Sequence, residues 1–117
     1  MNLNPNIILE KLNSLLPVIM ERYGVVRIGL FGSYIRGEAS GASDIDIIAI
    51  FEEERETFDN YMDLKYFLED IFHNPVDLVI EDTIKTRIKH QILNETVYAW
   101  ETGLCMLMIF WMGIIRT

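Results

Sequence analysis

Two segments, Leu30-Phe-Gly-Ser-Tyr-Ile-Arg-Gly37 and Ser43-Asp-Ile-Asp46, carry the strongest pattern in this 117-residue chain. The apolar residues from Ile28 to Phe31 predict a strand that Gly32-Ser33 ends. The residues from Ile45 to Phe51 predict a second strand, and ten residues separate Ser33 from Asp44. The spacing therefore predicts that a strand end and a pair of carboxylates lie close together in the fold.

Asp44 and Asp46 stand at the start of the second predicted strand. Side chains two residues apart on a strand point to the same face, so the two carboxylates lie near each other. Carboxylates this close repel each other unless a cation lies between them. Carboxylate oxygens, together with waters and substrate phosphates, are the ligands that Mg²⁺ prefers. The pair therefore predicts a magnesium site.

Gly32 and Ser33 lie where the first strand ends and a short helical turn begins. Backbone N–H groups and the positive end of a helix dipole favour phosphate at such a place. The Ser33 hydroxyl could also contribute, and Arg36 has the reach to pair with phosphate. Arg36 could equally form a structural ion pair with the aspartates or with Glu38. A phosphate site beside a metal site on adjacent strands indicates an enzyme that uses nucleoside triphosphates.

The apolar-Gly-Ser motif, followed after about ten residues by Asp-apolar-Asp, resembles the signature of the polymerase-β-like nucleotidyltransferases. The fuller strings Gly32–Gly37 and Ser43–Asp46 resemble the minimal nucleotidyltransferases, the MNT or MntA group, which are antitoxin partners of HEPN-domain ribonucleases. The resemblance covers roughly residues 5–101 and is specific, because two motifs occur in the right order and spacing. It implies an α/β (α+β) fold, with helices packed on a small mixed β-sheet.

The resemblance also implies a third aspartate on a neighbouring strand, and Asp77, between Val76 and Leu78, is the only strand carboxylate available for it. A carboxylate between apolar residues is uncommon in a buried sheet, although Asp77 could instead merely cap the strand after Pro75. By resemblance, the site binds two Mg²⁺ ions and takes ATP as substrate. The predicted catalytic and metal residues are Asp44, Asp46 and Asp77, and the predicted nucleotide-binding residues are Gly32, Ser33 and Arg36.

The same resemblance implies transfer of AMP to a protein hydroxyl, with a tyrosine of a HEPN ribonuclease toxin as acceptor and the chain as its antitoxin. Two other functions stay open. The site could modify a small molecule such as an aminoglycoside, or the chain could neutralise a toxin by binding without chemistry.

The remaining sequence predicts alternating helices and strands. Asn4-Pro5 starts an amphipathic helix that Gly24 ends, and Pro17 predicts a kink or two abutting helices. Glu52–Glu56 predicts a charged loop. The other predicted elements are strands Val25–Phe31, Val76–Ile80 and Thr96–Trp100, a helical turn Ser33–Arg36, and helices Phe58–Phe72 and Ile84–Leu93.

Composition limits the partners and the compartment. The net charge is −8 and no Lys/Arg cluster is visible, so we expect no direct binding of nucleic acid. One cysteine, Cys105, excludes an internal disulfide, which agrees with a reducing cytoplasm. The N-terminus lacks the features of a signal peptide, and no apolar run reaches the roughly 18 residues that a membrane span needs.

The length predicts one domain, residues 1–101, followed by an apolar C-terminal tail, residues 102–117. Leu104–Ile115 is almost entirely apolar and contains three methionines together with Phe110 and Trp111. Such a segment could complete the core or cover an apolar surface of the domain. It could also form an interface with a partner or in an oligomer, because exposed apolar patches usually mark interfaces. A non-functional tail is the third alternative.

Overall fold

The computed structural model describes residues 3–40 and 43–99, which form one mixed four-stranded sheet in the order β3-β2-β1-β4. Its strands are β1 (Val25–Phe31), β2 (Ile45–Phe51), β3 (Val76–Ile80) and β4 (Val97–Tyr98). Strand β2 is antiparallel to β1 and parallel to β3, and β4 is antiparallel to β1. The predicted α+β fold with a small mixed sheet is therefore confirmed.

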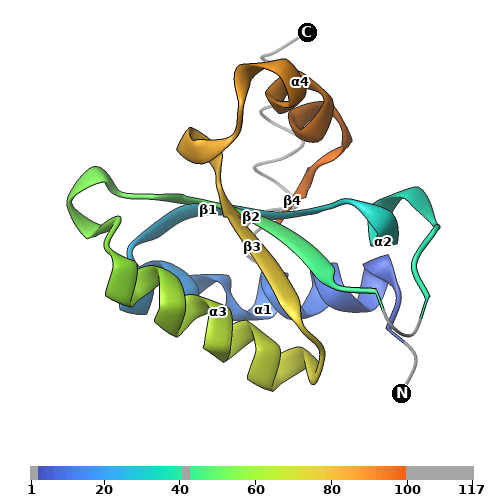
Figure 1. Ribbon diagram of the computed structural model, residues 1–117. Helices are drawn as coiled ribbons and strands as arrows, with labels where there is room; N and C mark the ends of the chain where they lie inside the picture. The colour runs from blue at the N-terminus through green and yellow to red at the C-terminus, as the bar shows by residue number, and fades with distance from the viewer. Residues whose placement is uncertain (1–2, 41–42, 100–117) are drawn as a thin grey trace, which may run out of the picture.

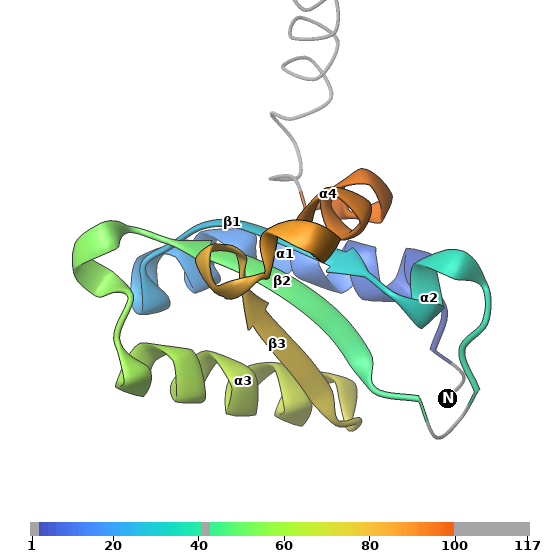
Figure 2. The ribbon, with the colours of Figure 1, turned by 45° about the horizontal axis from the view of Figure 1, so that its top comes forward.

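The helices divide between the two faces of the sheet. Helices α1 (Pro5–Tyr23) and α3 (Phe58–Phe72) lie on one side, and α4 (Thr86–Glu95) lies on the other (Figure 1). The turned view agrees, with the sheet between α3 and α4 (Figure 2). The short helix α2 (Ser33–Arg36) follows β1 directly. The face that carries α4 also carries the predicted site residues.

Helix α1 begins and ends as its sequence predicts. The Asn4 side chain accepts a hydrogen bond from the Ile7 N–H at 2.9 Å, and Gly24 ends the helix at a φ of 73°. Pro17 lies inside the single helix, so the alternative of two abutting helices is wrong. The buried residues of α1 continue on one face past the proline, and this packing holds the two halves together. They are Ile8, Leu12, Leu16, Ile19 and Tyr23.

The main core lies between the sheet and helices α1 and α3. Ile45, Ile47 and Ala49 of β2 belong to this core, as do Val76 and Leu78 of β3. Alternate residues of a strand point to opposite faces, so the residues between them point toward the α4 side. The core positions of two neighbouring strands thus determine which face receives their carboxylates.

Side chains of α3 cover the outer edge of β3. The Tyr61 hydroxyl donates to the Leu78 carbonyl at 2.7 Å, and the Lys65 ammonium donates to the Val76 carbonyl at 3.1 Å. The Val76 N–H in turn donates to the Glu69 carboxylate at 2.9 Å. Three backbone groups of β3 that face away from β2 therefore have partners on α3.

The largest differences from the predicted elements lie after β3. A 3₁₀ turn at Glu81–Thr83 follows the strand, and α4 runs from Thr86 to Glu95, two residues later than predicted at each end. The last strand is only Val97–Tyr98 within the described residues. Ile84 has an extended backbone with a ψ of 131°, so it connects the two helical segments. Apolar periodicity alone did not reveal this connection.

Two further predictions concern the charged loop and the C-terminal tail. Glu53–Arg55, inside the predicted charged loop, forms a 3₁₀ turn. The apolar tail, residues 102–117, and its predicted boundary after residue 101 lie outside the described residues. In the described part of the chain, no helix is both long enough and apolar enough to cross a membrane.

Pro17 generates a prediction about stability. A proline inside a helix costs about 3 kcal/mol relative to alanine, of which about 1 kcal/mol is offset because proline also restricts the unfolded chain. Pro17 is exposed, so its replacement removes little packing. We expect Pro17→Ala to raise the free energy of unfolding by about 2 kcal/mol in denaturant titrations.

The neighbouring variant Val18→Ala is the matched control, since Val18 is 40% exposed on the same helix. It should change the free energy of unfolding by about 0.5 kcal/mol or less. A loss of stability in Pro17→Ala would mean that the proline stabilises the helix by a contact of its own.

Candidate active site

Two of the predicted aspartates are register partners on parallel strands. Asp46 of β2 lies directly beside Asp77 of β3. Their strand neighbours Ile45, Ile47 and Val76 belong to the core, so both carboxylates point to the opposite face. Asp46 is partly buried and Asp77 is exposed. The sheet itself therefore brings these two carboxylates together.

Asp44 precedes β2 by one residue and is exposed. Its charge nevertheless acts on Asp46, because the pKa of Asp46 is raised by burial first and then by the charges of Asp77 and Asp44. A hydrogen bond with the Asp77 side chain adds to the rise in the pKa, while a hydrogen bond from the Ser33 backbone opposes it. The predicted repulsion among the carboxylates is thus present, and it centres on Asp46.

Gly32 lies against the Asp46 carboxylate. Its φ of 79° and ψ of −151° are tolerated by glycine and strained for other residues. A Cβ atom at this position would overlap the Asp46 side chain. Both its conformation and its surroundings therefore require glycine, and the close approach lets the following residue, Ser33, donate its N–H to Asp46.

Arg36 is paired with two carboxylates. Its Nε donates to Glu38 at 2.8 Å and its Nη1 donates to the Oε2 atom of Glu95 at 3.0 Å. The same Oε2 atom accepts the Gly32 N–H at 2.7 Å. Of the two alternatives that the sequence left open for Arg36, the structure contains the ion pair, with Glu38 as one expected partner.

Glu95 is the residue of the site that sequence reasoning missed. It is the last residue of α4 and lies 63 residues from Gly32 along the chain. A lone glutamate at a helix end resembles an ordinary solvated residue. No local pattern in the sequence distinguishes it, and only the position of α4 on the sheet brings it to Gly32.

The residues present fit a magnesium ion, although the structure contains no ready cage for one. In the part of the chain that the structure describes, no three His, Cys, Asp or Glu side chains are arranged to hold a metal ion. Mg²⁺ is usually bound by only one or two carboxylates, with waters and substrate phosphates as its other ligands. The adjacent Asp46 and Asp77, whose repulsion a cation would relieve, meet that requirement. Metal ligation by Asp44, Asp46 and Asp77 stays a prediction.

The family model of the nucleotidyltransferase domain matches residues 9–99. The protein adenylyltransferase MntA of Thermococcus cleftensis is 40% identical over 94 residues, which are 77% of this chain and 94% of that protein. The chain belongs to the minimal nucleotidyltransferase family. The predicted resemblance is thus confirmed, as is the prediction that this chain is a nucleotidyltransferase enzyme.

Solved structures agree with this family. A structure described as a candidate minimal nucleotidyltransferase has a TM-score of 0.71 and 33% identity, and it covers 82% of this nucleotidyltransferase and 96% of its own chain. A chain from the complex of a tri-AMPylated Shewanella oneidensis HEPN toxin with its MNT antitoxin shares the fold. Its TM-score is 0.57 at 18% identity, with 96% of this chain and 87% of that chain covered.

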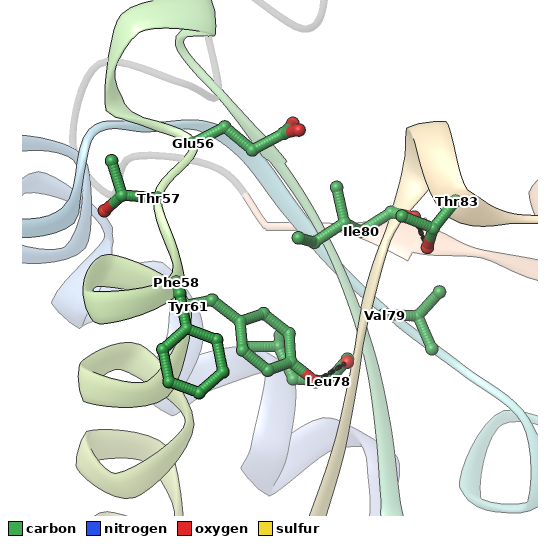
Figure 3. Close-up of a pocket in the computed structure, with 8 residues that line it drawn as sticks. All are labelled: Glu56, Thr57, Phe58, Tyr61, Leu78, Val79, Ile80 and Thr83. Atoms are coloured by element: carbon green, nitrogen blue, oxygen red, sulfur yellow. Dashed lines mark hydrogen bonds between the residues drawn. The ribbon is translucent and has the colours of Figure 1, made fainter.

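A separate pocket of about 380 Å³ lies between the start of α3 and the end of β3 in this nucleotidyltransferase. Figure 3 shows Tyr61 of α3 extending to Leu78 of β3, with the Phe58 ring beside it. The pocket contains none of the predicted site residues. Its lining residues are Glu56, Thr57, Phe58, Tyr61, Leu78, Val79, Ile80 and Thr83.

The raised pKa of Asp46 predicts how the metal-free nucleotidyltransferase responds to pH. A carboxyl group whose pKa rises on folding, here above the ordinary 3.8, binds its proton more tightly in the folded state. Ionised Asp46 therefore lowers stability above the raised pKa, and this cost disappears as the pH falls through it toward 3.8. We expect Asp46→Asn to be as stable as the parent or more stable at pH 7, with the difference shrinking in acid.

Thermal unfolding in a chelating buffer measures this difference. Added Mg²⁺ should then raise the melting temperature of the parent more than that of Asp46→Asn, because a ligand stabilises the state that binds it. A variant that is less stable than the parent at pH 7 would show that Asp46 serves the fold rather than a site.

Proposed function

We propose that this chain transfers AMP from ATP to a hydroxyl of a partner protein, a tyrosine of a HEPN-domain toxin, and thereby acts as an antitoxin. The observation that carries the proposal is the adjacent pair Asp46 and Asp77, on the sheet face that also presents Gly32-Ser33. Two relatives support it. The Thermococcus cleftensis relative is named as a protein adenylyltransferase, and the Shewanella oneidensis complex contains an AMPylated HEPN toxin with an MNT antitoxin.

The carboxylates would hold magnesium beside the α-phosphate. Asp44, Asp46 and Asp77 are the residues that would bind it, and the metal would supply charge neutralisation and activation of the acceptor hydroxyl. Two ions would suit this chemistry. Asp46 is partly buried and fixed by the Ser33 N–H, so it is the more rigid ligand. Asp77 is exposed, so it lies where an acceptor from another protein could approach.

The transfer requires one bond to form and one to break. The acceptor oxygen attacks the α-phosphorus of ATP, the bond to the β-phosphate oxygen breaks, and pyrophosphate leaves. The hydroxyl proton passes to a nearby base, for which Asp77 is the candidate. Gly32 and Ser33 would contact the β- and γ-phosphates, and Arg36 would balance their charge. Because ATP and a toxin acceptor are cytoplasmic, we place the protein in the cytoplasm.

Labelled ATP tests this function. The protein, Mg²⁺ and a purified HEPN-domain toxin should yield a labelled HEPN chain, with AMP on a tyrosine by mass spectrometry. Asp46→Asn should reduce the rate of transfer at least about 100-fold, because the metal would lose a ligand. Asp70→Asn is the control, since it removes an exposed carboxylate from α3. It should transfer at the parental rate.

Other outcomes would identify a different function. Transfer to an aminoglycoside, with no label on the HEPN protein, would assign a small-molecule acceptor. Inhibition of the HEPN ribonuclease by the Asp46→Asn variant as well as by the parent would indicate an antitoxin that acts by binding alone.

Asp77 should differ from Asp46 in nucleotide binding. If the exposed Asp77 mainly serves the acceptor side, Asp77→Asn should bind a non-hydrolysable ATP analogue with magnesium within about threefold of the parent, yet lose transfer. Asp46→Asn should lose affinity for the same analogue. Calorimetric titration measures both variants, and an equal loss of affinity would contradict this division of roles.

A further inference from the structure

Glu95 occupies two hydrogen-bond donors of the candidate site. Its Oε2 atom accepts both the Gly32 N–H at 2.7 Å and an Arg36 N–H at 3.0 Å. Two converging donors on one oxygen resemble the recognition of a phosphate oxygen, which has the same charge and the same hydrogen-bonding role. The Glu95 side chain is 18% exposed, so it is held within the site rather than extended into solvent.

We propose that Glu95 is an intramolecular competitor of the nucleotide, so that ATP binds only when its phosphates displace the Glu95 carboxylate. This inference rests on the proposed function. It assigns to Glu95, at the end of α4, control over the affinity for nucleotide.

The position of Glu95 is fixed by the strand that follows it. Strand β4 pairs with β1 through Gly29 and Leu30, and the Ala99 N–H donates to the Ile28 carbonyl at 2.8 Å. A Cβ atom on Gly29 would press against Thr96 and Val97, so glycine permits this close approach. The chain therefore delivers the Glu95 side chain to Gly32 by strand pairing rather than by chance contact.

The negative charges around the site are the reason that Glu95 and a triphosphate would compete. The site already contains the charges that act on Asp46, those of Asp44 and Asp77. A triphosphate that approached while Glu95 kept its donors would place anionic oxygens beside another carboxylate without new donors to stabilise them. Once Glu95 leaves, the Gly32 N–H and the Nη1 group of Arg36 become available to phosphate.

Glu38 is the natural control for Glu95, because it also pairs with Arg36. It binds the Nε atom of Arg36 at 2.8 Å, on the other side of the guanidinium from the Nη1 group that Glu95 contacts, and its side chain is 64% exposed. Among the described residues, the Glu38 carboxylate pairs with Arg36 and not with Gly32, so it leaves the backbone donor uncovered. The two glutamates thus form a matched pair for a test, equal in charge and in their partner Arg36.

The test compares Glu95→Gln with Glu38→Gln. Glutamine keeps the length of the side chain and removes the charge, so the competing charge-assisted hydrogen bonds weaken. We expect Glu95→Gln to bind a non-hydrolysable ATP analogue with Mg²⁺ about tenfold more tightly than the parent, because each hydrogen bond to a charged group contributes on this scale. Glu38→Gln should stay within about twofold. Calorimetry without any acceptor protein measures the three dissociation constants.

Each alternative result has a separate meaning. Weaker or unchanged binding in Glu95→Gln would overturn the inference and leave Glu95 as a structural partner of Gly32, with the proposed function intact. Equal tightening in both variants would also overturn it, because the net charge would then explain the effect. If neither the parent nor Glu95→Gln binds the analogue, the proposed function fails and the inference fails with it.

A second experiment uses the parent protein, so its result does not depend on whether a variant folds. NMR of the Glu95 carboxyl carbon during titration with the analogue should show a shift that saturates together with a shift of the Gly32 amide. A Glu95 carboxyl signal that stays unchanged at saturation would overturn the proposal.

Discussion

The parallel pairing of β2 with β3 is the constraint on which the site depends. Its register places Asp46 beside Asp77, and the core residues on either side of each leave the two carboxylates only the opposite face. Burial and neighbouring charge then raise the pKa of Asp46. The apolar packing of the domain thus maintains an electrostatic cost at one point of its surface. A cation would relieve that cost, and this is the electrostatic basis of the proposed metal site.

Two glycines allow the other segments of the site to approach one another closely. Gly32 allows the chain to pass against Asp46, and Gly29 allows β4 to approach β1 closely enough for Glu95 to reach Gly32. Three segments that are distant in sequence therefore meet here, because Glu95 accepts the Gly32 N–H and Asp46 accepts the N–H of the next residue, Ser33. A side chain at either glycine would overlap its neighbours and push these segments apart.

Much of this arrangement was predictable from the sequence, because its signals are local. Strands β1, β2 and β3 begin and end where apolar runs meet glycine, carboxylates or proline, and the Asn4 cap fixes the start of α1. The predicted start of α4 was two residues too early, because Ile84 fits the helical period yet has an extended backbone.

The role of Glu95 was not predictable, since it arises from tertiary packing. The pairing of Arg36 with a carboxylate was only one of two alternatives for the same reason. Pro17 shows the converse case: the local rule offered a kink or two abutting helices, and the chain forms one helix, whose buried residues lie on both sides of the proline.

The covered edge of β3 limits how this domain can assemble. A foreign strand that extended the sheet there would have to break the bonds from Tyr61 and Lys65 to the β3 carbonyls. Each such bond contributes on the order of 1 kcal/mol. Sheet extension through β3, a common route to aggregation, is therefore disfavoured. A protein that docks on this side would have to recognise side chains rather than backbone.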